Sequence, residues 1–147
     1  MVVVAIGFAE ALSAPEVTWS LVDAGFKVIA FSRRGRRGAL RHSHHVAIFE
    51  ITAPEKDCAA GLEELAAVLD SQHAEHMMPS VLLPLDDASL WLCSRVQPST
   101  RWILAGASRH NAELAIDKRS SRATHRHIAF IDLDCPVKRS GGISTCI

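Results

Sequence analysis

The chain has 147 residues, 48% of them hydrophobic, and a formal net charge of zero. This apolar content argues against a largely disordered chain and suits one globular domain with its own core. A neutral total charge provides no general attraction to nucleic acid or to a membrane surface, so we expect neither as a partner.

Targeting and cysteine signals favour a cytoplasmic protein. The apolar stretch at residues 1–14 has no basic start and is interrupted by Glu10, so it is a poor signal peptide. No segment reaches the roughly 20 apolar residues that span a bilayer. The four cysteines are widely spaced and form no C-x-x-C pair. This spacing disfavours a disulfide framework or a zinc site and favours a reducing compartment.

Apolar runs and helical patterns alternate from the start of the chain. Residues 2–6 predict a buried strand, and residues 14–24 predict a helix after it. Ser13 and Glu16 have the spacing of a capping box, with Pro15 in the first turn. Gly25 is placed to end this helix in a left-handed conformation.

The same alternation continues through the middle of the chain. Strands are predicted at residues 27–31 and 46–51, separated by an arginine-rich turn. Thr52 and Glu55 again have a capping-box spacing. The helix that they open is expected to run to about Ser71.

Two further strands complete the predicted fold. A strand is expected at residues 81–85, with Asp86 or Asp87 as the cap of the following helix, and another at residues 102–105 before a helix over 109–126. Five strands joined by helical crossovers predict an α/β fold, a Rossmann-like three-layer sandwich with a mainly parallel five-stranded sheet. Such sheets bind ligands at the carboxyl ends of their strands.

The loops after the first two strands test for a dinucleotide site. The first loop has Gly7 alone where the fingerprint requires G-x-G-x-x-G, which disfavours that site. Arg33 and Arg34 follow the second strand, where arginines can meet the 2′-phosphate of NADP or pair with carboxylates. A solvated arginine loop is the alternative. No aromatic residues interleave with these arginines, so they do not predict a nucleic-acid interface.

Acidic residues and histidines supply the remaining candidates. One residue of the pair Asp86 and Asp87 is expected to cap a helix, while the other holds a ligand amine or hydroxyl; a purely structural role for both is the alternative. The histidines at positions 42, 44 and 45 have no nearby cysteine or carboxylate to complete a metal site, so none is expected there. No set of residues predicts a catalytic triad.

Three phrases occur in a characteristic order along the chain. They are Ala-Gly-Phe-Lys-Val at residues 24–28, Val-Leu-Leu-Pro-Leu-Asp-Asp at 81–87, and Ala-Glu-Leu-Ala-Ile-Asp-Lys at 112–118. Together they resemble the N-terminal domain that precedes the ATP-grasp fold in carboxylate–amine ligases such as biotin carboxylase. The resemblance is lost near Arg126, so we expect a pre-ATP-grasp domain at residues 1–123 and a divergent or loosely ordered tail at 124–147.

The resemblance implies ATP-dependent activation of a carboxylate and its transfer to an amine or thiol. It implies ATP and Mg²⁺ as cofactors of the full-length family, with Lys118 near the ATP phosphates. It also implies that Asp86 and Asp87 lie near the acceptor substrate, whereas Arg33 and Arg34 have no family counterpart. The glycine-rich loop, second lysine and metal carboxylates of that family are not found in these 147 residues. The chain alone is therefore expected to be inactive and not to bind ATP stably.

Two other functions stay open. One is a stand-alone Rossmann-like protein that binds NADP or another phosphorylated small molecule through Arg33 and Arg34. The other is a non-catalytic interaction module, which would self-associate through apolar surface that a second lobe would otherwise cover.

Overall fold

A computed structural model describes residues 2–76, 80–107 and 110–116. Its sheet is entirely parallel, and the strand order is β3-β2-β1-β4-β5. The strands are β1 (Val3–Gly7), β2 (Lys27–Arg33), β3 (Ala47–Ile51), β4 (Ser80–Pro84) and β5 (Trp102–Leu104). The five predicted strands are thus all present, and the Rossmann-like α/β arrangement is confirmed. The strand order reverses between β1 and β4, which is where such folds bind their ligands.

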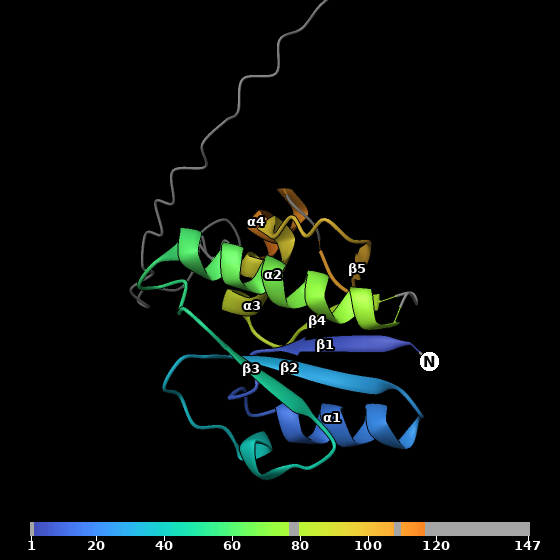
Figure 1. Cartoon of the computed structure of the whole chain (residues 1–147). Helices are drawn as coiled ribbons and strands as arrows, with labels where there is room; N and C mark the ends of the chain where they lie inside the picture. Colours follow the sequence, from blue (N-terminus) through green and yellow to red (C-terminus); the bar gives the residue numbers. More distant parts are fainter. Residues whose placement is uncertain (1, 77–79, 108–109, 117–147) are drawn as a thin grey trace, which may run out of the picture.

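Helices cover both faces of the sheet, giving three layers (Figure 1). One face carries α1 (Ala14–Asp23) and the short 3₁₀ helix η1 (Ala39–His42). The other face carries α2 (Cys58–His76) and α3 (Asp87–Arg95), and α4 (His110–Ile116) packs against α3. We call these the α1 face and the α2/α3 face.

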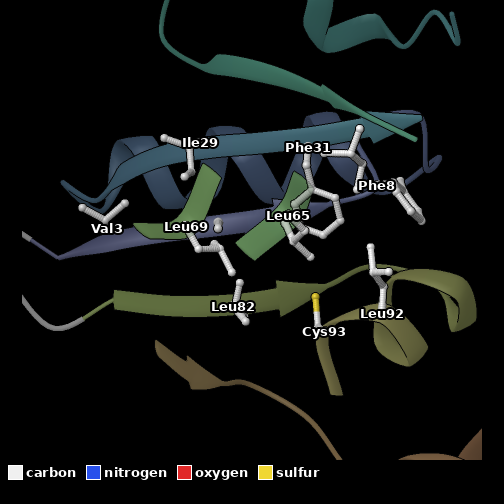
Figure 2. Close-up of a cluster of buried hydrophobic side chains, with 11 residues drawn as sticks. Val3, Phe8, Ile29, Phe31, Leu65, Leu69, Leu82, Leu92 and Cys93 are labelled. Carbon is white, nitrogen blue, oxygen red and sulfur yellow. The ribbon is translucent and has the colours of Figure 1, made fainter. Parts of the chain in front are cut away.

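The core of the α2/α3 face is built from large side chains. Phe8 and Phe31 meet edge to face, with ring centroids 5.2 Å apart. Leu65 and Leu69 of α2 and Leu92 of α3 lie fully buried in the same cluster (Figure 2). Burying side chains of this size contributes about 1.5–3 kcal/mol each, so this face supplies much of the stability.

The core of the α1 face is built from smaller side chains. Its buried members are Val4, Ile6, Ala9, Ala14, Val28, Ala30, Leu40 and Val46. Alternate residues of β1 and β2 enter the two cores because successive side chains of a strand point to opposite faces.

The predicted start of α1 is only partly right. Pro15 lies in the first turn, and Gly25 after the helix has the expected left-handed backbone, with φ of 83°. Ser13, however, makes no side-chain hydrogen bond at the helix start, so the predicted capping box does not form.

The predicted start of α2 is wrong. The helix begins at Cys58, and the Asp57 carboxylate caps it by accepting the backbone N–H of Ala60 at 3.0 Å. Thr52 and Glu55 do not form the expected capping box. Glu55 instead binds the Arg33 side chain at the end of the neighbouring strand β2, and Thr52 binds Glu64 of α2. The helix also continues past the predicted end, to His76.

Several expectations concern the rest of the chain. Lys118 and the tail at residues 124–147 lie outside the described residues. No helix in the described ranges is long and apolar enough to cross a membrane. Cys93 is a free buried thiol, and burial, with a smaller effect from Asp86, raises its pKa to about 12.

Candidate functional site

Arg33 ends β2 at the carboxyl edge of the sheet. Strand alternation directs its side chain to the α2/α3 face, the same face as Phe31. The guanidinium carbon lies over the Phe8 ring, 3.8 Å from its centroid. The side chain is only 15% exposed. Flat contact with a ring holds the guanidinium in one orientation and adds a cation–π attraction.

Three carboxylates converge on this guanidinium. Nη1 lies 2.8 Å from Glu10 Oε1 and 3.9 Å from Asp86 Oδ2, and Nη2 lies 2.9 Å from Glu55 Oε1. Glu10 follows β1, Glu55 follows β3 and Asp86 follows β4. We call these four residues the Arg33 cluster. They join the ends of four neighbouring strands at the reversal of strand order.

The cluster carries more negative than positive charge. Burial lowers the pKa of Arg33, but hydrogen bonds to Glu55 and Glu10 outweigh it and raise the pKa above its ordinary value. Partial burial raises the pKa of Glu55, but the hydrogen bond from Arg33 outweighs it and lowers the pKa. One guanidinium against three carboxylates leaves a formal charge of minus two when all four groups are ionised.

Glu10 provides an acceptor that the cluster does not use. Its Oε1 binds the Arg33 guanidinium and also accepts the Arg33 backbone N–H at 3.4 Å. Its Oε2 is buried and has no hydrogen-bond partner in the part of the chain that the structure describes. A buried carboxylate oxygen without a partner is costly, so it favours a ligand group that donates a hydrogen bond.

Asp86 has two structural roles. Its Oδ1 accepts the backbone N–H of Ser89 at 2.7 Å, while Ser89 Oγ accepts the Asp86 N–H at 3.0 Å, so a complete capping box starts α3. Its Oδ2 faces Arg33. The sequence predicted that one of Asp86 and Asp87 caps the helix and that the other faces the ligand site. In the structure, Asp86 both caps α3 and faces Arg33. Asp87 is exposed in the first turn of α3.

Arg34 belongs to a different set of contacts. Its Nη2 lies 3.1 Å from Glu64 Oε1, and its side chain is 60% exposed. Glu64 also accepts the Thr52 backbone N–H at 2.6 Å, and this bond is the first cause of its lowered pKa. The structure therefore does not bring Arg34 into the Arg33 cluster. An exposed ion pair of this kind contributes about 0–1 kcal/mol.

No known protein family, characterised protein or solved structure matches this chain. Its function therefore has to be argued from the chemistry of the site itself.

Sequence reasoning missed two members of the cluster. The sequence pattern showed Glu10 only as an interruption of an apolar stretch, and it predicted for Glu55 only a role in a capping box. The available signal was an acidic residue in the loop after each of two buried strands. Within the described residues, no three His, Cys, Asp or Glu side chains are placed to hold a metal ion.

Proposed function

We propose that this chain is the substrate-side domain of an ATP-grasp-type ligase and that the Arg33 cluster receives the amine acceptor. One observation carries the proposal: Glu10, Glu55 and Asp86 converge on Arg33 at the reversal of strand order, with negative charge in excess. Negative charge at the carboxyl ends of parallel strands attracts an ammonium group. The sequence resemblance supports the ligase class.

The residues of the cluster have distinct roles in this proposal. Arg33 holds the carboxylates in place through its short ion pairs. Glu10 Oε2 accepts a hydrogen bond from the amine. Asp86, fixed as the cap of α3, adds negative charge from the loop after β4. Their combined action is to bind and orient the acceptor.

ATP does not fit the Arg33 cluster, and no three His, Cys, Asp or Glu side chains among the described residues are placed to hold Mg²⁺. The guanidinium that could bind a triphosphate is already paired with carboxylates, and these would repel phosphate oxygens. ATP, when bound, supplies the phosphoryl group that activates the carboxylate. We assign its binding to lobes outside these 147 residues, with Lys118 as the one residue of this chain proposed to reach its phosphates.

A titration with small amines tests the acceptor site. Glycinamide, which is cationic and has no carboxylate, should shift the backbone amide resonances of Glu10, Arg33 and Asp86 in a ¹H–¹⁵N spectrum, whereas neutral acetamide should not. Glu10→Gln should weaken glycinamide binding about tenfold, because a hydrogen bond to a charged group contributes about 1.5 kcal/mol. Asp87→Asn is the matched control, with the same loss of charge outside the cluster.

Two outcomes would overturn the proposal. One is equal shifts with acetamide and glycinamide, which would remove the charge argument. The other is ATP-dependent ADP release by the purified chain alone, which would show that the ATP site is not elsewhere.

The interaction-module alternative has one observation in its favour. Trp19 on α1 and Ile103 on β5 are 61% and 52% exposed. Sedimentation over a range of concentrations would test it, since a monomer at every concentration would count against self-association. The NADP alternative at Arg33 and Arg34 has no comparable support, because carboxylates occupy both guanidiniums.

A further inference from the structure

A hollow lies on the other face of β2, away from the Arg33 cluster. It is a cavity of about 290 Å³. Its floor is formed by Ser32 of β2 and by Ile48 and Glu50 of β3, and Ser32 and Glu50 are paired in the sheet register. Arg36 and Arg41, from the connection between these strands, also line the cavity.

The irregular connection between β2 and β3 explains the cavity. A crossover between parallel strands usually contains a full helix, but this one contains only the four residues of η1. Leu40 anchors η1 in the core, while Glu50 of β3, whose side chain points to this face, stays exposed and Ile48 is only half-buried. The β3 side of the α1 face is therefore incompletely covered.

One wall of the cavity is closely packed. A Cβ added at Gly38 would lie 2.6 Å from the carbonyl oxygen of Ala9, so the connection touches the loop after β1 directly. Both residues line the cavity. This contact fixes one side of the arginine-bearing connection against the sheet.

The two arginines of the cavity differ from Arg33 in how firmly they are held. Arg41 has a single long contact, 4.0 Å from Nη1 to Glu50 Oε1, with side chains 57% and 41% exposed. Arg36 has no ion pair within 4.0 Å among the described residues, and its charge has a small part in lowering the pKa of Glu55. Two guanidiniums and one carboxylate give the lining a formal charge of plus one. Both arginines thus keep donors for an anionic ligand.

We propose that this cavity binds a small organic phosphate, a phosphomonoester of about the size of a pentose phosphate. The planar donor forks of Arg36 and Arg41 match phosphate oxygens. The Ser32 hydroxyl and the Glu50 carboxylate suit the hydroxyl groups of a sugar, and Ile48 offers an apolar floor. The volume is near the lower end of the roughly 300–1,000 Å³ typical of ligand pockets, which disfavours a dinucleotide.

Calorimetry and thermal unfolding with three probes test this site. Ribose 5-phosphate should bind and raise the Tm, inorganic phosphate should bind several-fold more weakly, and ribose should show no binding. The double variant Arg36→Gln/Arg41→Gln should lose at least tenfold in affinity for ribose 5-phosphate. Arg37→Gln, an exposed neighbour outside the cavity lining, should bind as the wild type does.

Further variants separate this site from the Arg33 cluster and from simple charge attraction. Arg33→Gln should bind ribose 5-phosphate as the wild type does. The amine site at the Arg33 cluster and the phosphate site in the cavity can therefore be tested independently. Glu50→Gln should raise the affinity for inorganic phosphate about threefold, because it removes a carboxylate that repels the anion. The ratio of the affinity for ribose 5-phosphate to that for inorganic phosphate should therefore become smaller. Equal losses in Arg37→Gln and in the double variant would overturn the proposal, as would equal affinity for inorganic phosphate and ribose 5-phosphate or no binding at all.

Discussion

The two faces of the sheet are built from the same strands in different ways. On the α2/α3 face, Phe31 and Arg33 of β2 meet a full helix and short ion pairs. On the α1 face, α1 covers part of the same strand, but beside Ser32 and β3 the cover is only the four-residue η1, and a cavity with loosely paired arginines remains. The covering element, more than the strand, decides whether a face becomes packed core or binding surface.

The difference has an energetic meaning. Large side chains under a long helix bury much apolar area and cost the most to truncate. Small side chains under a short connection contribute less and leave room for a ligand. Mutations should therefore affect stability mainly on the first face and ligand binding mainly on the second.

The largest expected effect is from truncating the α2/α3 core. Phe31→Ala should lower the free energy of unfolding by about 3–5 kcal/mol, because the ring is fully buried against Phe8. Ile48→Ala on the α1 face should cost clearly less, because that side chain is half-buried beside the cavity. Urea unfolding of both variants measures the contrast. Equal losses would show that the two faces contribute alike.

The second-largest loss of stability is expected from removing the Arg33 guanidinium. Arg33→Gln leaves three carboxylates facing one another, and we expect a loss of about 2–3 kcal/mol, below the value for a fully buried pair. Adding Glu10→Gln to this variant should recover part of the loss. Arg34→Gln, which removes only an exposed pair, should change stability by less than about 1 kcal/mol. Thermal unfolding at neutral pH would test this order.

The helix caps give a smaller effect. Asp86→Ala should cost about 1 kcal/mol, because its carboxylate caps α3 through Ser89. Ser13→Ala should have almost no effect, because Ser13 makes no side-chain hydrogen bond at the start of α1. Chemical denaturation of the two variants would distinguish them. A comparable loss in Ser13→Ala would contradict the observed cap geometry.

The smallest expected effect is on the pH dependence of stability. The pKa of Glu55 is lowered in the folded protein from its ordinary 4.5, chiefly by the Arg33 hydrogen bond acting against partial burial. Its contribution to stability is therefore present above pH 4.5 and is lost as the pH falls through the lower folded value. A ¹³C titration of the Glu55 carboxyl group should show this shift in the wild type. An unchanged Glu55 pKa in Arg33→Gln would contradict the assigned cause.

Local patterns predicted the strands well and the helix starts less well. Strands such as β1 and β4 are apolar runs of a few residues, and buried parallel strands have that composition whatever surrounds them. The helix starts depend on which partner an acidic side chain finds. Glu55 has the spacing of a capping-box residue, but it binds Arg33 on the neighbouring strand, so α2 starts later, at Cys58.

The amino-acid sequence by itself determined the α/β class, the parallel strands and the sheet edge at which a site is expected, because these follow from periodicity and short-range preference. Only the tertiary structure decided that Glu10, Glu55 and Asp86 meet at Arg33, since three loops distant in sequence come together at the end of β2. It also decided that the connection after Arg34 leaves a cavity over β3. Strand order and the path of a crossover are set by long-range packing, which one-dimensional spacing does not contain.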